Sequence, residues 1–391
     1  MLKFEEAYRI VMEASFSMEK ENIPYTGSLG RVLAAPVKSD IDMPPWDRSA
    51  VDGYACRQDD LGKELAVLET IAAGTPPCHA VTPGKCSRIM TGAIVPDGAD
   101  YIFMLEESKE VDGNRVIFTG KPGKSNISKR AEDVMKGETI LRHGHFIRPQ
   151  DIAVMAMAGA TTVTVGCKVK VGVISTGNEL VEPDKAPSQG QIRNSNAWQM
   201  LAQIDRAGAR GTYYGIATDD EATTLRLIKK AIGENDVVLI SGGVSEGDFD
   251  FVPSALKSMK LTIHFDQVAV QPGKPLTFCT GERKIVFGLP GNPVSTFVQF
   301  ELMVRPLLEK MMGSKEEKPV IMLLLGTDFS RKRADRMALI PVRINDEGEA
   351  VPIEYHGSAH ITALPGAWGI ITIPQGQSWI QKGEPVSVRQ I

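Results

Sequence analysis

The stretch Asp236–Gly247, which reads DVVLISGGVSEG, decides the fold class. Its first half is a short apolar run rich in β-branched residues, which is typical of a strand buried on both faces of a parallel sheet. Its second half is rich in glycine and in side chains that carry oxygen, which is typical of a loop that approaches a ligand. The stretch therefore predicts an α/β sheet with a ligand-binding loop at the carboxyl end of a strand.

Strands and helices alternate on both sides of this stretch. The pattern predicts strands at 171–175, 212–217, 236–241, near 268–270 and at 285–288, and helices at 197–209, 221–232, 251–259 and 293–311. Such alternation implies a mostly parallel sheet in a three-layer α/β/α arrangement. Further helices are expected at 3–18 and 149–161, whereas short β-like runs fill most of 67–146 and the chain after 313.

Composition excludes several classes of protein. The chain has 391 residues, is 42% hydrophobic and carries a formal net charge of −4, which does not fit a protein that wraps nucleic acid. Its five cysteines form no CxxC pair, which argues against a disulfide framework or a zinc site. The longest uncharged apolar stretch, 152–167, is too short to span a bilayer, and the first residues lack a signal core. We therefore expect no membrane or nucleic-acid partner and a cytoplasmic location.

Five successive strand ends carry glycine, serine, asparagine or carboxylate side chains. The carboxyl ends of parallel strands meet at one sheet edge, where α/β proteins bind ligands. The loops are Thr176–Glu179, Thr218–Asp220, Ser241–Asp250, Gln271–Pro275 and Leu289–Pro293.

Three of these loops have features that suit an anion such as phosphate. Gly242 and Gly243 would let backbone N–H groups approach an anion, and Lys274 would add a positive charge. Pro293 suits the first turn of a helix whose N-terminus favours an anion. Alternatively, the glycine pair is only a tight turn and the lysine is solvated. Neither GxGxxG nor GxxxxGK[ST] occurs here, which argues against dinucleotide and P-loop sites.

Three carboxylates on the same edge point to a divalent cation. Glu179, Asp219 and Asp250 offer the hard oxygen ligands that Mg²⁺ prefers, and the ion would bridge to phosphate oxygens. Asp219 could instead cap the helix that follows it.

Polar clusters also occur before the α/β region. The loop Met43–Ala55, MPPWDRSAVDGYA, combines polar and rigid residues, and such loops often carry function. Within it, Asp52–Gly53 could alternatively form a hairpin corner. Two further clusters are Arg88–Ala93 and Lys129–Asp133.

Seven motifs stand in order along the chain: Pro45–Ala55, Thr91–Ala93, Ser175–Leu180, Asn194–Asn196, Ser241–Ser245, Pro272–Pro275 and Leu289–Pro293. Gly357–Ser358 and Lys382–Val386 complete the series. The series resembles that of the molybdopterin molybdenumtransferase family of MoeA type, which is related to the C-terminal part of gephyrin. The resemblance covers essentially the whole chain.

The resemblance implies a multidomain α/β protein with β lobes that forms a homodimer. It implies a cleft between the α/β domain of one subunit and the inserted lobe of the other. That cleft would bring Asp52, Thr91 and Asp133 opposite the three carboxylates of the sheet edge. The expected parts are an N-terminal helical and linker lobe (1–41 with 137–168), an inserted all-β lobe (42–136), an α/β molybdopterin-binding domain (169–313) and a C-terminal β-barrel-like lobe (314–391).

The implied reaction belongs to molybdenum cofactor biosynthesis. Adenylylated molybdopterin and molybdate are the expected substrates, and Mg²⁺ is the expected cofactor. The phosphoanhydride is hydrolysed, AMP leaves, and the dithiolene sulfurs capture molybdenum. A molybdopterin-adenylylating enzyme and molybdoenzyme acceptors are the expected partners.

Residue roles follow from the resemblance as hypotheses. Asp219 and Asp250 would hold Mg²⁺ on the nucleotide side, with Glu179 as a further metal ligand. Glu179 and Asp52 would position molybdate or its water ligands, which makes these four carboxylates the expected catalytic set. The expected substrate-binding residues are Thr91, Asp133, Asn196, Ser241, Gly242, Gly243, Ser245, Lys274, Pro290, Pro293 and Ser358.

The chain departs from the family pattern at four positions. Asn178 stands where many relatives carry aspartate, and Ser128 where a basic residue is common. Gln267 and Gln271 stand where many relatives carry lysines, which removes positive charge near the expected oxyanion site.

Two other functions fit part of the pattern. An enzyme that adenylylates the pterin would need only the α/β domain, and the loop Asp47–Ala55 and the β lobes argue against it. A binding scaffold, as gephyrin is for receptor tails, has no need to gather four or five carboxylates at one cleft. A bound peptide without AMP release would favour the scaffold.

Overall fold

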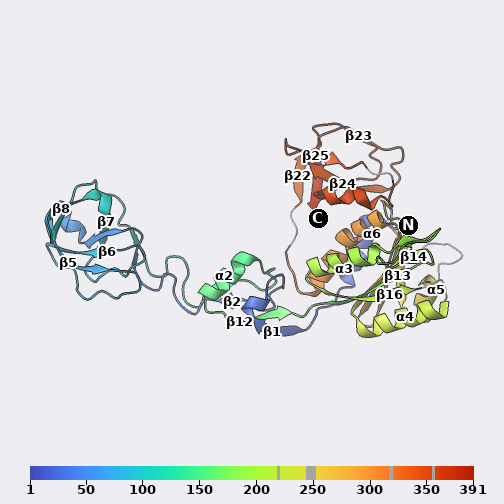
Figure 1. Ribbon diagram of the computed structural model, residues 1–391, viewed down its shortest axis with the longest axis horizontal. Coiled ribbons are helices and arrows are strands. Elements are labelled where there is room, and N and C mark those ends of the chain that lie inside the picture. Colours follow the sequence, from blue (N-terminus) through green and yellow to red (C-terminus); the bar gives the residue numbers. More distant parts are fainter. Residues whose placement is uncertain (218–220, 244–251, 317–319, 355–356) are drawn as a thin grey trace.

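The computed structural model describes residues 1–391 except 218–220, 244–251, 317–319 and 355–356. Three six-stranded sheets, placed at separate points of an elongated chain, form its framework (Figure 1). Strands outnumber helices, and the expected multidomain α/β class is confirmed. No described helix is long and apolar enough to cross a membrane.

The central sheet follows the order β16-β13-β17-β21-β20-β18. Its first four strands are parallel, and β20 is antiparallel to both of its neighbours. The strands are β13 (Lys170–Thr176), β16 (Arg210–Ala217), β17 (Val237–Ser241), β18 (Thr262–Gln267), β20 (Pro275–Gly281) and β21 (Lys284–Leu289).

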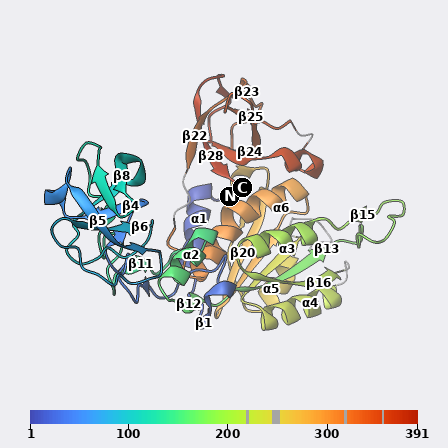
Figure 2. The ribbon, with the colours of Figure 1, turned by 60° about the vertical axis from the view of Figure 1, so that its left-hand side comes forward.

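Helices cover both faces of this sheet because its central strands are apolar on both sides. Along β17, Val237 and Leu239 join one buried core, whereas Val238 and Ile240 join the other. The first core includes α3 (Asn196–Arg206), α6 (Pro293–Gln299) and α7 (Arg305–Met311), and the second includes α4 (Glu221–Glu234) and α5 (Val252–Ser258). Figures 1 and 2 show α3 and α6 on one side of the sheet and α4 and α5 on the other.

The sequence pattern was wrong about one strand and missed another. The strand expected near 268–270 lies earlier, as β18, while β19 (Val270–Gln271) pairs with a strand of the C-terminal sheet. β20 was not predicted, although its residues 276–279 are buried. A two-residue turn joins it to β21, and sheet pairing rather than local pattern defines this hairpin.

Three of the expected helices are shorter or interrupted in the structure. α1 is Phe4–Glu13 rather than 3–18, and α2 is Pro149–Met157 rather than 149–161. The long helix expected at 293–311 contains a π-helical segment, Phe300–Val304, between α6 and α7. α1 packs its buried side chains into the same core as α7, whereas α2 belongs to a separate small core.

The second sheet lies in residues 43–134, which we call the inserted lobe. An antiparallel bridge between Met43 and Val134 joins the two ends of this segment. This lobe and the central sheet lie at opposite ends of the elongated molecule (Figure 1). Its strands, in the order β7-β4-β6-β5-β9-β8, are β4 (Gly53–Cys56), β5 (Glu64–Ile71), β6 (Lys85–Ile89), β7 (Tyr101–Met104), β8 (Ser108–Asp112) and β9 (Arg115–Phe118).

Gly53 begins β4 and is not a hairpin corner. A Cβ atom at this position would lie 2.0 Å from the Phe103 carbonyl oxygen, so the glycine permits close approach to β7. The preceding strand β3 (Arg48–Ser49) pairs with β10 (Ile127–Ser128) and not with β4, so the alternative interpretation of Asp52–Gly53 as a hairpin corner is wrong.

The third sheet forms what we call the C-terminal lobe (residues 320–391). Its order is β19-β24-β26-β28-β22, with β25 paired to β24. The strands are β22 (Ile321–Leu324), β24 (Met337–Ile344), β25 (Ala350–Pro352), β26 (Gly369–Ile373) and β28 (Pro385–Gln390).

Five two-stranded pairs complete the described strands. They are β1 (Lys20–Pro24) with β12 (Thr162–Gly166), β2 (Val37–Lys38) with β11 (Thr139–Leu141), β3 (Arg48–Ser49) with β10 (Ile127–Ser128), β14 (Leu180–Val181) with β15 (Ile192–Arg193), and β23 (Phe329–Ser330) with β27 (Trp379–Ile380).

Candidate functional site

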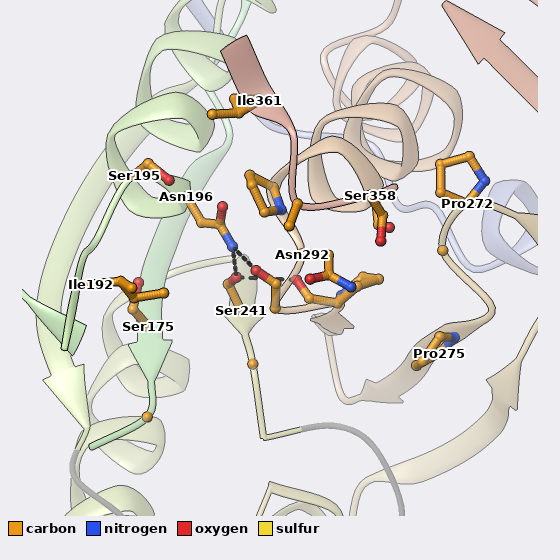
Figure 3. A pocket seen from close by; sticks show the side chains of 18 of the residues that line it. Ser175, Ile192, Ser195, Asn196, Ser241, Pro272, Pro275, Asn292, Ser358 and Ile361 are labelled. Atoms are coloured by element: carbon orange, nitrogen blue, oxygen red, sulfur yellow. Dashed lines mark hydrogen bonds between the residues drawn. The ribbon is translucent and has the colours of Figure 1, made fainter. Parts of the chain in front are cut away.

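A cavity of about 1030 Å³ opens at the carboxyl edge of the central sheet. Loops after β13, β17 and β21 and the loop before β20 form most of its wall, and the C-terminal lobe closes one side (Figure 3). It brings together nine of the residues expected from the sequence: Glu179, Asn196, Ser241, Gly242, Gly243, Lys274, Pro290, Pro293 and Ser358.

Asn196, at the start of α3, ties three parts of this wall together. Its Nδ2 donates to the Ser241 hydroxyl at 2.8 Å and to the Gly291 carbonyl at 2.7 Å (Figure 3). Since a carbonyl can only accept, the Gly291 contact fixes which end of the amide faces the loop. The Ser241 hydroxyl in turn donates to the Pro290 carbonyl at 3.3 Å. The expected residues of three separate motifs thus form one hydrogen-bonded unit.

The loop after β17 depends on glycine at its first position. Gly242 has φ +89°, and a Cβ atom there would lie 2.6 Å from the Thr176 carbonyl oxygen. Its N–H donates to the Leu289 carbonyl at 3.1 Å, so this amide is already used within the sheet edge. Any backbone contact with phosphate in the glycine pair therefore falls to Gly243, whose φ is +65°.

The loop Gln271–Pro275 presents Lys274 at the cavity. Gly273 has φ +97°, and the fully buried Gln299 of α6 donates its Nε2 to the Gly273 carbonyl at 3.0 Å. This bond anchors the loop from below and leaves the Lys274 side chain exposed at the surface of the cavity.

The C-terminal lobe supplies Arg336 and Ser358 to the same cavity. The Ser358 carbonyl accepts the Val294 N–H of α6 at 3.0 Å, which joins the lobe to the first turn of that helix. The Arg336 side chain is only 20% exposed. It provides a positive charge on the wall that includes Gln271.

Family models match nearly the whole chain. They are the MoeA N-terminal region (domain I and II) over 2–159, a probable molybdopterin binding domain over 172–310 and the MoeA C-terminal region (domain IV) over 324–391. The molybdopterin molybdenumtransferase of Staphylococcus epidermidis is 33% identical over 99% of this chain and 95% of its own length. The chain belongs to the MoeA family of molybdopterin molybdenumtransferases.

Solved structures agree with this membership. The molybdopterin biosynthesis moeA protein from Pyrococcus horikoshii OT3 superimposes with a TM-score of 0.87 at 31% identity, and each chain is fully covered. A second structure of a moeA protein from the same species gives a TM-score of 0.81 at 32% identity. As a family member, the chain is a transferase of molybdenum cofactor biosynthesis, as the sequence motifs predicted.

Three expected residues of this MoeA family member lie on the inserted lobe, away from the cavity. The Asp52 carboxylate accepts the Thr91 N–H at 2.6 Å and the Thr91 hydroxyl at 2.7 Å. These two bonds, with the positive charge of Arg88, lower the pKa of Asp52 below its usual value. Asp133 lies 4.0 Å from the Arg48 guanidinium. One chain alone therefore does not unite the two groups of expected residues (Figure 1).

Three other expected residues, Asp219, Ser245 and Asp250, lie outside the described residues. Within the described part of the chain, no three His, Cys, Asp or Glu side chains gather into a group that could hold a metal ion. Glu179 is the described carboxylate at the cavity wall.

Sequence reasoning missed several residues of the cavity. Asn292 stands inside a quoted motif, and its place in a loop after a strand was a usable signal. Arg336 belongs to no sequence motif that we identified. It directly precedes a strand of the C-terminal lobe, and the packing of that lobe on the sheet edge brings it to the cavity.

Proposed function

We propose that the chain hydrolyses the phosphoanhydride of adenylylated molybdopterin, releases AMP and transfers molybdenum from molybdate to the dithiolene. The observation that carries this proposal is the composition of the cavity. One wall holds the Asn196–Ser241–Gly291 unit, and the facing loops present the cations Lys274 and Arg336. A pterin with polar ring edges and a charged phosphate chain need these two kinds of wall.

Each wall has a stated task in this proposal. Lys274 and Arg336 attract the phosphate oxygens and the molybdate oxyanion, since both ligands carry negative charge. Gly243 allows close backbone approach to the phosphate chain. Glu179 would orient the water that attacks the anhydride, so that AMP leaves and the pterin keeps its own phosphate. Thr91, Asp133, Ser245, Pro290, Pro293 and Ser358 would complete the substrate contacts.

The described residues fit Mg²⁺ only in part. Mg²⁺ in phosphoryl sites uses one or two carboxylates together with substrate phosphates and water. Glu179 supplies one such carboxylate, and Asp219 and Asp250 are the proposed others, outside the described residues. When bound, the ion would neutralise charge on the phosphate oxygens.

A homodimer would complete the site. Asp52 and Thr91 form a rigid acidic unit on a lobe that stands apart from its own cavity. We propose that this unit faces the cavity of the partner, where Asp52 and Glu179 together position molybdate. A cytoplasmic location, and exchange of the pterin with an adenylylating enzyme and with molybdoenzymes, accord with this reaction.

The experiment measures AMP release from adenylylated molybdopterin with Mg²⁺, in the presence and in the absence of molybdate. Molybdate-dependent AMP release, with the metal retained on the pterin, is the expected result. Pterin binding without AMP release under either condition contradicts the proposal and favours a binding scaffold.

A further inference from the structure

The inserted lobe has a pocket of its own, apart from the main cavity. Its volume is about 270 Å³, and its walls come from β4, β5, β6 and the hairpin of β8 and β9 (Figure 2). Two arginines and three carboxylates line it. The proposed function gives this pocket no task, so its chemistry has to be explained by the partners that each of these groups has.

Three hydrogen-bond donors stand side by side on the wall of this pocket. Tyr54 of β4 is the antiparallel partner of Arg88 of β6, and Thr70 of β5 is the parallel partner of Arg88 on its other side. Directly paired residues project from the same face of a sheet. The phenol, the guanidinium and the threonine hydroxyl therefore form a row across three neighbouring strands, and all three residues line the pocket.

Arg88 is the cation of this row, and the lobe gives it no partner. Within the part of the chain that the structure describes, its guanidinium forms no hydrogen bond and no ion pair, although its Nε is buried. Asp52 does not fill this place: Arg88 lowers the pKa of Asp52 through its charge alone, because the two hydrogen bonds that Asp52 accepts come from Thr91. A buried cation without a partner costs free energy, and an anion beside it offsets that cost.

Most other charges of the pocket are satisfied within the lobe. The Glu69 carboxylate accepts two backbone N–H groups, at 2.9 and 3.1 Å. Arg115 pairs with Glu64 at 3.3 Å and lies 3.9 Å from Asp112. Glu110 has no partner among the described residues, but it is exposed to solvent. Because solvent screens an exposed charge more than a partly buried one, the arginine of the row dominates the field inside the pocket.

Tyr54 is a fixed donor beside this cation. Its ring stacks on Phe103 with 5.4 Å between centroids, and only 3% of the residue is exposed. Burial raises the pKa of the phenol, so it keeps its proton at neutral pH and can donate to an anion. Its hydroxyl bonds none of the residues that the structure describes. Arg88 and Tyr54 therefore present donors that the lobe itself does not use.

We infer that Arg88, Tyr54 and Thr70 bind a small oxyanion on the inserted lobe. A guanidinium offers a planar set of N–H donors that matches two oxygens of a carboxylate or of a phosphate-like ion, and the two hydroxyls can hold a further oxygen. The pocket has room for such an ion and several waters, since one water takes up about 30 Å³. This site goes beyond the proposed function and does not depend on it.

The test follows the fluorine resonances of the full chain labelled with 3-fluorotyrosine while phosphate, molybdate or acetate is added. Tyr54→Phe assigns the Tyr54 resonance among those of the 7 tyrosines. We expect a saturable shift of this resonance with at least one of the three anions and none with chloride at equal ionic strength. A response to acetate alone identifies a carboxylate as the ligand, whereas a response to phosphate or molybdate identifies a tetrahedral oxyanion.

Three variants relate the shift to the pocket. Arg88→Met should weaken anion binding roughly tenfold to a hundredfold, the range for lost hydrogen bonds to a charged group. Arg88→Lys keeps the charge without the planar fork and should weaken it less. Glu110→Gln should tighten binding, because it removes a charge that repels the anion. Arg57→Met is the matched control, since Arg57 lies on the same lobe but outside the pocket, 3.3 Å from Asp59.

Four results would overturn the inference. They are a shift that chloride reproduces, binding that is unchanged in Arg88→Met, binding that weakens in Glu110→Gln, and loss of the Tyr54 shift in Lys274→Met, which would place the anion in the main cavity. If circular dichroism shows that Arg88→Met does not fold, Arg88→Lys and Glu110→Gln decide the question. The proposed reaction is judged separately by AMP release, because the shift does not require turnover.

Discussion

At the scale of single residues, the two hydrogen bonds from Thr91 stabilise the ionised form of the Asp52 carboxylate. Both bonds go to the same carboxylate oxygen, one from the backbone and one from the hydroxyl. They favour the ionised carboxylate and so hold its pKa below the usual value of 3.8. Because the folded pKa is lowered, the bonds stabilise the fold above pH 3.8, and this stabilisation is lost as the pH falls through the folded pKa.

Thr91→Val should therefore raise the pKa of Asp52 toward 3.8, because one of its two donors is removed. The measurement is the pH titration of the Asp52 carboxyl carbon by nuclear magnetic resonance. Thr91→Ser keeps the hydroxyl and serves as the control, with little change expected. An Asp52 titration that is identical in Thr91→Val and in the unaltered chain would show that the hydroxyl bond is absent in solution.

At the scale of elements, the sequence predicted the parts with a strong local signal. The runs at 171–175, 236–241 and 285–288 became the central parallel strands because continuous apolar residues leave few alternatives to a buried strand. The strand at 275–281 was missed, since its identity depends on pairing with β21 rather than on local pattern. The position of the cavity could be predicted once these strands were recognised, because the carboxyl ends of parallel strands meet at one edge of the sheet.

The C-terminal contribution to the cavity could not be predicted from local pattern. Arg336 and Ser358 reach the cavity only because the C-terminal lobe packs on α6, through the bond between Ser358 and Val294. Such long-range packing leaves no periodic trace in the sequence. Ser358 was predicted only because it stands in a motif of the family resemblance, whereas Arg336 stands in none.

Helix α6 positions the Lys274 loop through its residue Gln299. Gln299 is the last residue of α6, directly before the π-helical segment, and its buried amide bonds the Gly273 carbonyl. Gln299→Met keeps the length of the side chain and removes the donor. Because a buried carbonyl then loses its partner, we expect the free energy of unfolding to fall by about 1 kcal/mol.

The same substitution should also loosen the loop. Hydrogen exchange at the Lys274 amide should become faster, and pyrophosphate should bind more weakly. Gln199→Met on α3 is the control, since the amide there contacts Gln203 at 3.4 Å and not the loop. Equal exchange at Lys274 in both variants would show that Gln299 does not position the loop.

At the scale of the whole molecule, the two groups of candidate residues stand at opposite ends of one elongated chain (Figure 1). If the site combines lobes from two subunits, two inactive variants should rescue each other. Asp52→Ala damages only the inserted lobe, and Glu179→Gln damages only the cavity. In a mixed dimer, one site receives both damaged parts and the other receives both intact parts.

Random exchange of equal amounts should then restore about a quarter of the AMP release of the unaltered chain, since half of the dimers are mixed and each mixed dimer has one intact site. Mixing each variant with itself is the control and should restore nothing. If Asp52 and Glu179 act within one chain, every chain in the mixture remains defective, and an inactive mixture of exchanged subunits would refute the shared cleft.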